Sequence, residues 1–325
     1  MKAKILVTRR LPPKAMALLE ENFQVVCNLH DRSLERAELM ENVRGKEGLL
    51  PLVTDRIDGQ VMDAAGGVLK VIANYAVGYN NIDMDAATQR KIAVTNTPGV
   101  LTETTADLAM ALILAVARRI AESDAFVRAG RYEGWGPLLL LGTDVHHQAL
   151  GILGFGRIGC AVAKRAAGFD MRILYHDPVR VKPDLEKQFN AKYVDKETLL
   201  RESDFITLHV PLTRETTHLI GAEELSLMKP TAFIINTARG EVINEEALVE
   251  ALQAKKIAGA GLDVFEKEPE IHPALTKMEN VVILPHIGSA SLETRTKMGL
   301  MAAENLIAGL KGEVPPNCLN PEVLR

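Results

Sequence analysis

Short apolar runs alternate with helical stretches in the first part of the chain. Continuous apolar runs predict buried strands at residues 5–7, 25–27, 48–50 and 71–73. Helical periodicity predicts helices at 32–43 and 60–65, between strands. Strands that alternate with helices in this way are typical of a small parallel sheet covered by helices.

A turn-forming stretch from Thr95 to Gly99 interrupts this alternation and is a predicted hinge. A long helix rich in Ala and Leu is expected to follow, from about Thr102 to Gly130. A final amphipathic helix is predicted from Ser291 to Lys311, before Gly312. We expect this last helix to pack back on the first domain, which would then contain both ends of the chain.

The alternation resumes in the second half of the chain with more regular spacing. Continuous apolar runs predict six further strands, at 149–153, 172–175, 205–208, 232–235, 261–264 and 281–284. Runs without polar alternation suit a parallel sheet that is buried on both faces.

A glycine-rich turn follows the first of these strands. Its sequence is Gly154-Phe155-Gly156-Arg157-Ile158-Gly159, and a helix is predicted immediately after it, at 160–167. Strand, turn and helix in this order are the context that a dinucleotide pyrophosphate requires. Gly154 allows the tight turn, Gly156 lets the backbone approach the phosphates, and Gly159 permits close packing of helix and strand.

An acidic residue ends the next predicted strand, as this cofactor interpretation requires. Asp177 is placed to bind the hydroxyl groups of the adenosine ribose. Its carboxylate would repel a 2′-phosphate, so NAD is favoured over NADP, although Arg180 and Lys182 lie close by in the sequence. The alternative interpretation of Asp177 is a turn cap before Pro178.

These observations predict an α/β protein with two doubly wound parallel-sheet domains. A Rossmann NAD-binding domain, 99–289, is expected to be inserted in a flavodoxin-like substrate domain made of 1–98 and 290–325. The length of 325 residues suits two domains.

Composition and charge limit the partners and the compartment. Apolar residues make up 47% of the chain and charged residues 25%, as in an ordinary globular protein. A net charge of −4 gives no reason to expect nucleic acid or an anionic membrane as a partner. The apolar stretch at the start is too short for a signal peptide. The scattered Cys27, Cys160 and Cys318 suit a reducing compartment, so a cytoplasmic location is expected.

Three chemically reactive side chains follow strands of the second domain. Arg239 follows the predicted strand 232–235, and Glu268 and His286 follow the next two strands. Ligands of a doubly wound sheet gather at the carboxyl ends of its strands. Singly, these residues have ordinary alternatives: a surface cation, a solvated acidic residue and a core histidine.

Together, these three residue types suit hydride transfer to a 2-oxo acid. Arg239 can hold a carboxylate through two hydrogen bonds and polarise the adjacent carbonyl. His286 can donate a proton to the carbonyl oxygen as hydride arrives, and take it back in oxidation. Glu268 can hydrogen-bond the imidazole and hold its tautomer.

The remaining histidines are weaker candidates. His209 also ends a strand, and it is expected to line the cofactor cleft. His146 and His147 have no accompanying ligand set and are predicted to lie in a loop, so no metal site is expected. The chain has no Gly-x-Ser-x-Gly elbow, which argues against a serine hydrolase.

Several motifs together resemble the D-isomer-specific 2-hydroxyacid dehydrogenase family over nearly the whole chain. They are the stretches 151–159, 209–213, 236–240, 261–265 and 285–289. Within the family, residues 73–83 and 95–102 are most similar to the glyoxylate/hydroxypyruvate reductases.

The resemblance implies further site residues. Val77 and Gly78 would bind the substrate carboxylate through backbone N–H groups, beside Arg239 and His286, and Trp135 would reach the active site of a neighbouring subunit or only anchor the interface. Asp263 would contact the nicotinamide carboxamide. The full set of residues implied for the cofactor is Thr105, Gly154, Gly156, Arg157, Ile158, Gly159, Asp177, His209, Pro211, Thr237, Ala238, Arg239, Asp263, His286, Gly288 and Ser289.

The resemblance also implies a homodimer that pairs through its cofactor domains, with the helix 102–117 as the expected dimer element.

The predicted function is reversible hydride transfer between NAD(H) and a small D-2-hydroxy acid or 2-oxo acid, with glyoxylate or hydroxypyruvate as the expected substrate. Two alternatives stay open: an activity like that of D-3-phosphoglycerate dehydrogenase, and an NAD(H)-sensing protein like the family's corepressors. Asp177 itself departs from the NADP-preferring reductases of this subgroup.

Overall fold

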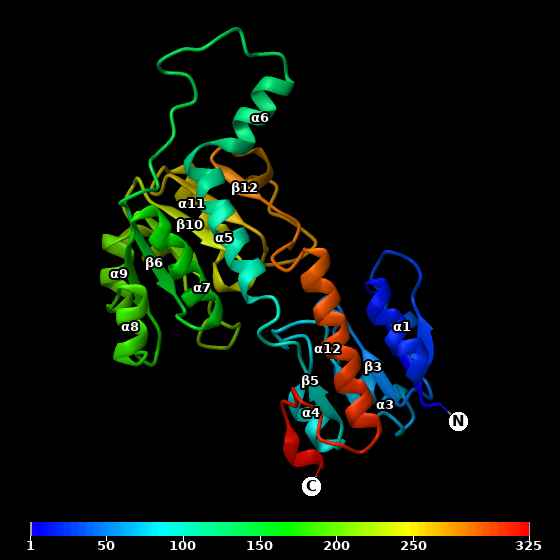
Figure 1. Ribbon diagram of the computed structural model, residues 1–325. Helices are drawn as coiled ribbons and strands as arrows, with labels where there is room; N and C mark the ends of the chain where they lie inside the picture. Colours follow the sequence, from blue (N-terminus) through cyan, green and yellow to red (C-terminus); the bar gives the residue numbers. More distant parts are fainter. Residues whose placement is uncertain (1, 325) are drawn as a thin grey trace. The chain divides into compact units, whose positions relative to one another are not determined.

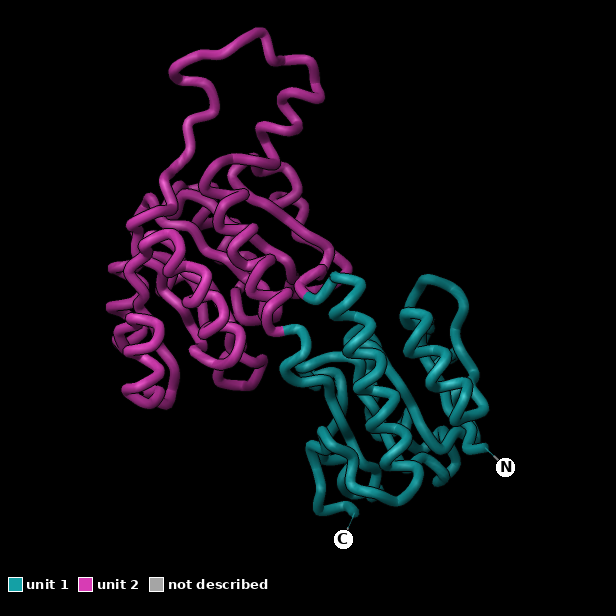
Figure 2. Tube along the Cα trace, in the orientation of Figure 1, with its two compact units in different colours: residues 1–101, 289–325 teal, residues 102–288 magenta. Residues whose placement is uncertain are grey.

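The computed structural model describes residues 2–324, which divide into two compact units. Unit 1 contains the residues up to Leu101 and those from Ser289 onward, and unit 2 is the continuous stretch Thr102–Gly288 (Figure 2). Unit 1 is therefore built from two segments that are far apart in the sequence.

Unit 1 is a five-stranded parallel sheet with the strand order β2-β1-β3-β4-β5. This is the flavodoxin-like order. The strands are β1 (Lys4–Val7), β2 (Gln24–Cys27), β3 (Gly48–Leu50), β4 (Val71–Ala73) and β5 (Ala93–Thr95). The helices are α1 (Pro13–Asn22), α2 (Arg36–Asn42), α3 (Gly59–Ala64), α4 (Met84–Gln89) and α12 (Leu292–Leu310).

Helices cover both faces of this sheet. Leu6 packs with side chains of α2, α3 and α4, whereas Ile5 and Val7 pack with α1 and α12. Ser291 caps α12, because its hydroxyl accepts a hydrogen bond from the N–H of Thr294. Alternate residues of a strand face opposite sides, so these continuous apolar runs build two cores at once.

Unit 2 is a seven-stranded parallel sheet with the strand order β12-β11-β10-β9-β6-β7-β8. The strands are β6 (Ala149–Leu153), β7 (Arg172–His176), β8 (Ala191–Tyr193), β9 (Phe205–Leu208), β10 (Phe233–Asn236), β11 (Gly259–Leu262) and β12 (Val281–Ile283). The helices are α5 (Thr102–Ala117), α6 (Ile120–Arg128), α7 (Arg157–Ala166), α8 (Pro183–Phe189), α9 (Lys196–Glu202), α10 (Ala222–Leu227) and α11 (Glu245–Gln253). This confirms the predicted α/β class with two doubly wound sheets.

The direction of winding reverses beside β6. The chain runs from β6 outward to β7 and β8, and then returns to β9 on the other side of β6. A crevice forms at the carboxyl ends of strands at such a switch point, and ligands of this fold bind there. The glycine-rich turn follows β6, so the sequence motif lies at the switch point.

The predicted helix from Thr102 to Gly130 is wrong, because two helices occupy this stretch. α5 ends at Ala117, and Arg119 has a left-handed backbone with φ of 52°. The carbonyl of Ala117 accepts a hydrogen bond from the N–H of Thr143, at 2.8 Å, in place of a helical partner. α6 then starts in a new direction and has no buried residue (Figure 1).

Candidate active site

The glycine-rich turn has the shape that a phosphate group requires. Gly154 has a φ of 89°, and a Cβ there would lie 2.7 Å from the backbone of His209. A Cβ on Gly159 would lie 2.3 Å from the carbonyl oxygen of Gly154, so α7 packs tightly on the turn. A Cβ on Gly156 would meet no described atom within 4 Å, which leaves open space beside the backbone.

Gly156 is also the N-cap of α7, and no described side chain caps this helix. The first-turn N–H groups, which include those of Arg157 and Ile158, therefore face outward at the positive end of the helix dipole. Backbone donors, a helix N-terminus and open space together fit the pyrophosphate of a dinucleotide.

Asp177 lies directly after β7 and is bonded to the glycine-rich turn. Its Oδ2 accepts a hydrogen bond from the N–H of Phe155 at 2.9 Å, and its Oδ1 one from the N–H of Val179 at 3.4 Å. The bond to Val179 is what the turn-cap interpretation requires. The bond to Phe155 places the carboxylate beside the phosphate turn. Its ribose role stays a prediction.

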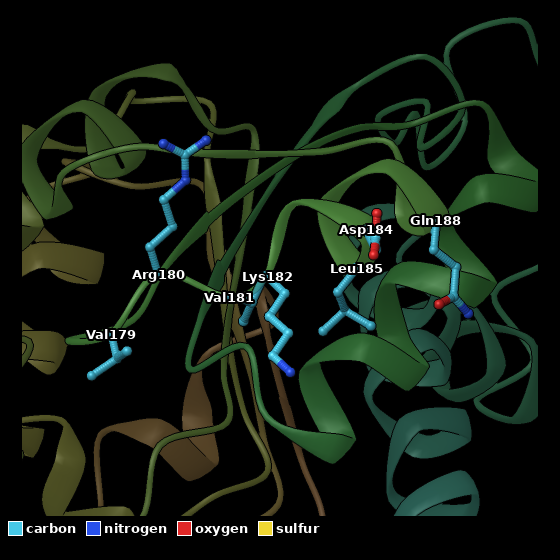
Figure 3. Close-up of a pocket in the computed structure, with 7 residues that line it drawn as sticks. All are labelled: Val179, Arg180, Val181, Lys182, Asp184, Leu185 and Gln188. Carbon is cyan, nitrogen blue, oxygen red and sulfur yellow. The ribbon is translucent and has the colours of Figure 1, made fainter.

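The two basic residues after Asp177 lie in a surface pocket (Figure 3). Arg180 forms a two-point ion pair with Glu186, at 2.8 and 2.9 Å, and Glu186 also accepts a hydrogen bond from the hydroxyl of Tyr175. Lys182 points in a different direction from Arg180 (Figure 3). The guanidinium of Arg180 is thus already bound to a carboxylate of its own unit.

His286 and Glu268 form a direct pair. Nδ1 of His286 lies 2.9 Å from Oε2 of Glu268, and Oε1 of Glu268 accepts a hydrogen bond from the N–H of Phe265. Burial raises the pKa of Glu268, but the hydrogen bond and the charge of His286 outweigh it and hold this pKa below its usual range. An ionised carboxylate on Nδ1 keeps the proton on that nitrogen and leaves Nε2 for other chemistry.

Asp263 anchors the loop that carries His286. Its two carboxylate oxygens accept hydrogen bonds from the N–H groups of Ile287 and Gly288, both at 2.7 Å. Its carbonyl oxygen accepts one from the N–H of His286, whose φ is 55°. Burial raises the pKa of Asp263, while the two amide bonds oppose this effect. This anchoring role was not predictable from the sequence, because nothing in the spacing of residues 263 and 286 indicates it.

Arg239 lies in a tight turn after β10. The side chain of Asn236 closes this turn, because its amide nitrogen donates to the carbonyl of Arg239 and its oxygen accepts from the N–H of Ala238. A Cβ on Gly240 would lie 1.9 Å from the backbone of Phe265, so the turn presses against the segment that leads to Glu268. Burial lowers the pKa of Arg239, and the charge of Glu268 opposes this effect. The guanidinium remains charged.

His209 follows β9, on the other side of the glycine-rich turn. Its Nε2 lies 2.9 Å from the hydroxyl of Thr207, and its Nδ1 is buried without a partner among the described residues. Burial lowers the pKa of His209 to about 3, so the ring is neutral at physiological pH. A neutral ring suits the wall of a cofactor cleft and not proton transfer.

The other predicted residues divide between the units. In unit 2, the hydroxyl of Thr105 donates to the carbonyl of Gly288, whereas the buried hydroxyl of Thr237 has no partner among the described residues. Pro211 and Ala238 lie in the segments that follow β9 and β10, and the side chain of Trp135 is exposed. Val77, Gly78 and Ser289 belong to unit 1.

His146 and His147 lie in a turn before β6, as predicted, and their rings meet edge to face. Across residues 2–324, His, Cys, Asp and Glu form no group of three or more placed to hold a metal ion.

In the same part of the chain, none of the helices has both the length and the apolar character needed to cross a membrane.

Known proteins resemble this chain over its whole length. Residues 110–288 match the family model described as "D-isomer specific 2-hydroxyacid dehydrogenase, NAD binding domain". A glyoxylate reductase from Thermococcus litoralis is 53% identical over 328 residues, which cover 100% of this chain and 98% of that protein.

Solved structures agree with this family. A protein from Thermus thermophilus matches with a TM-score of 0.91 and 49% identity. The match covers 97% of this chain and 99% of the Thermus thermophilus chain. A second match is an NADPH-dependent glyoxylate/hydroxypyruvate reductase from Sinorhizobium meliloti, in complex with NADP and malonate. It has a TM-score of 0.87 and 33% identity, and the match covers 100% of this chain and 99% of that chain.

The matched family model describes an NAD-binding domain, and the glycine-rich turn, Arg239, Glu268 and His286 lie within the matched residues 110–288. Similarity at this level extends over both units of the chain. The protein therefore belongs to the D-isomer specific 2-hydroxyacid dehydrogenase family, and it is an oxidoreductase that acts on CH–OH donors.

Proposed function

We propose that the protein reduces glyoxylate or hydroxypyruvate with NADH, reversibly. The observation that carries this proposal is the His286–Glu268 pair, at 2.9 Å, on the loops after β12 and β11, together with the half-buried Arg239 after β10. The glyoxylate reductase from Thermococcus litoralis supports this choice of substrate, since it is 53% identical over the whole chain.

Each residue has one task in the proposed reaction. The bound nicotinamide supplies or accepts the hydride. Arg239 holds the substrate carboxylate and polarises the neighbouring carbonyl group. His286 exchanges a proton with the carbonyl oxygen through Nε2, because Nδ1 is bonded to Glu268. Glu268 fixes the orientation of the ring and stabilises its protonated form.

The remaining predicted residues bind the cofactor and the substrate. The glycine-rich turn, Asp177 and the other predicted cofactor residues hold the dinucleotide. The backbone N–H groups of Val77 and Gly78 bind the substrate carboxylate.

We also propose that NAD is preferred to NADP. Asp177 places a negative charge beside the phosphate turn, which disfavours a 2′-phosphate. Arg180, the nearest candidate partner for such a phosphate in the sequence, is bound to Glu186. The Sinorhizobium meliloti reductase is named NADPH-dependent, so both cofactors belong in the test.

A homodimer and a reducing compartment complete the proposal. Apolar side chains of the segment after α6 are exposed, among them Trp135 at 84% and Leu138 at 80%. The apolar residues of α5 are largely buried in their own unit, so we place the contact with a second copy on this segment and not on α5. The three cysteines are free thiols, which suits a reducing cytoplasm.

A substrate panel tests the proposed reaction. Purified protein is mixed with NADH or NADPH and with glyoxylate, hydroxypyruvate, pyruvate, 2-oxoglutarate or phosphohydroxypyruvate, and nicotinamide absorbance is followed. Faster turnover of glyoxylate or hydroxypyruvate with NADH supports the proposal. A preference for phosphohydroxypyruvate would favour a phosphoglycerate dehydrogenase activity. Binding of NADH without turnover of any of these acids would contradict the proposal and favour a sensing role.

A further inference from the structure

The loop after β4 presents a row of unused backbone donors. Residues Val77, Gly78 and Tyr79 lie outside helices and strands, and their N–H groups donate to no acceptor among the described residues. Val77 and Gly78 are partly exposed and Tyr79 is exposed, so this part of the loop lies at the surface of unit 1. A polar group that is neither bonded nor buried is available to a ligand.

By contrast, the carbonyl group that precedes each of these three N–H groups accepts a hydrogen bond. The carbonyl of Ala76 accepts a hydrogen bond from the N–H of Thr97 at 2.9 Å. The carbonyl of Val77 accepts one from Nδ2 of Asn96 at 2.8 Å, and that of Gly78 one from Nδ2 of Asn74 at 2.9 Å.

Holding a carbonyl also sets the direction of the next N–H group. The peptide bonds of this loop are trans, and in a trans peptide the C=O and N–H bonds point in opposite directions. Because Asn96 binds the carbonyl of Val77, the N–H of Gly78 points away from Asn96. Because Asn74 binds the carbonyl of Gly78, the N–H of Tyr79 points away from Asn74. The N–H of Val77 is directed by Thr97 in the same way.

Both asparagines are anchored in the core of unit 1. Asn96 and Asn74 are buried, and the carbonyl of Asn96 accepts a hydrogen bond from Asn305 of α12. The side chains of Asn74 and Asn81 form two mutual hydrogen bonds at 3.2 Å. Asn81 in turn donates to the carbonyls of Leu52 and Asp55. The loop thus rests on a rigid network that contains no charged side chain.

We propose that Asn96 and Asn74 are positioning residues for carboxylate binding, and that the N–H of Tyr79 is a third donor beside those of Val77 and Gly78. The inference rests on the proposed function, in which this loop binds the substrate carboxylate. Preorganised donors bind an anion without paying for loop ordering, so loosening either carbonyl weakens carboxylate binding specifically.

The test uses the full chain and oxalate, a non-reducible analogue of glyoxylate. Oxalate binding is measured by calorimetry at saturating NADH, and NADH binding by fluorescence, for wild type, Asn96→Leu and Asn74→Leu. Leucine is close to asparagine in size but cannot donate. Asn28→Leu is the matched control, because Asn28 is also buried in unit 1 and donates to two carbonyls, those of Thr8 and Arg32.

We expect oxalate affinity to fall about tenfold in each loop variant, with KM for glyoxylate raised by a similar factor and a smaller change in kcat. NADH affinity should not change, and Asn28→Leu should bind oxalate like wild type. If Asn96→Leu melts below the assay temperature, Asn96→Ser removes the same bond at a smaller steric cost.

An oxalate affinity within about twofold of wild type in folded loop variants would overturn the inference and leave the proposed function intact. Equal losses of oxalate and NADH binding, or a matching loss in Asn28→Leu, would show a general structural role instead and would also overturn it. A wild-type protein that neither binds oxalate nor reduces any 2-oxo acid would contradict the proposed function itself.

Discussion

At the scale of single residues, the site depends on charges that are held in place by their neighbours. Asn236 donates a hydrogen bond to the carbonyl of Arg239, and His286 is hydrogen-bonded to Glu268. Asp177 accepts a hydrogen bond from the N–H of Phe155. Each of these candidate side chains therefore has a partner that holds it in place. Substituting the charged residue tests the role of its charge, whereas substituting the partner tests the role of its position.

Arg239→Ala removes the cation that is proposed to hold the substrate carboxylate. A lost charge-assisted contact of this kind costs about 4 kcal/mol, so kcat/KM for glyoxylate should fall roughly a thousandfold. NADH affinity should stay the same. Arg201→Ala, at an exposed ion pair on α9, is the control. Unchanged turnover in Arg239→Ala would remove Arg239 from the mechanism.

Glu268→Gln keeps the size of the side chain but removes the negative charge beside His286. Without this charge the Nδ1–H of His286 is held less firmly, so kcat for glyoxylate reduction should fall. Steady-state rates of wild type and Glu268→Gln measure this. Glu266→Gln, which removes a carboxylate bonded to His218, should keep the wild-type kcat.

The same residue links stability to pH. Folding lowers the pKa of Glu268 because of His286, even though burial opposes the shift. Its contribution to stability is therefore fully present above the unfolded value of about 4.3 and is lost as pH falls through the folded pKa. The difference in Tm between wild type and Glu268→Gln should shrink on acidification. A constant difference would argue against a carboxylate paired with His286.

Asp177→Ser removes the negative charge beside the phosphate turn. The ratio of kcat/KM for NADPH to that for NADH should rise by about tenfold or more, because like-charge repulsion toward a 2′-phosphate disappears. Asp184→Ser, on the rim of the nearby pocket, should leave the ratio as it is. If Asp177→Ser showed no shift, its only role would be that of a turn cap.

The placement of the candidate residues was predictable from the sequence, because they follow the carboxyl ends of neighbouring strands. Arg239, Glu268 and His286 each come shortly after an apolar run, and parallel strands end at one edge. The partners of these residues were not predictable. Asn236 and Asp263 act through hydrogen bonds to backbone groups whose direction depends on turn geometry, which residue spacing does not reveal.

At the scale of elements, the loop after β12 depends on β11. Asp263, at the end of β11, binds the N–H groups of Ile287 and Gly288 with both carboxylate oxygens. Strand β12 is short, Val281–Ile283, and the anchor adds to two backbone bonds beyond its end, from the N–H groups of Leu284 and His286 to the carbonyls of Leu262 and Asp263. This anchor is what keeps His286 beside Glu268.

Asp263→Asn tests this anchor. The asparagine amide has only one acceptor oxygen, so it can bind one of the two backbone N–H groups, and its NH₂ group faces the other, which is also a donor. We expect a loss of about 1–3 kcal/mol in the free energy of unfolding, with a fall in kcat as His286 loses its position. Asp204→Asn is the control, since Asp204 binds the N–H of Ala149 at the opposite end of the sheet. Wild-type kcat in Asp263→Asn would contradict the anchoring role.

Most strands were predictable as elements, whereas several helices were not. The apolar runs of β1, β6 and β9 have the continuous pattern of strands buried on both faces. The elements that were not predicted include the strands β5 and β8 and the helices α1, α4, α8, α9, α10 and α11. Of the residues in β8, only Ala191 is buried, so its sequence carries little apolar signal. The end of α5 was missed because the partner of the Ala117 carbonyl, Thr143, is distant in sequence.

At the scale of the whole molecule, the exposed apolar segment after α6 suggests a second copy of the chain. Trp135→Glu combined with Leu138→Glu places charges on the proposed contact, and light scattering after size exclusion should then report the mass of a monomer. Val314→Glu, at another exposed apolar residue, should leave the mass of the wild type. A dimeric mass in the double variant would place the contact elsewhere.

The division of unit 1 into two stretches of sequence has a consequence for protein synthesis. Ala302, Ala303 and Leu306 of α12 complete the core in which Ile5 and Val7 are buried. Residues up to Leu101 leave the ribosome before unit 2, whereas α12 emerges only after all of unit 2. Unit 1 is therefore completed after unit 2, and its apolar strands are exposed to aggregation until α12 emerges.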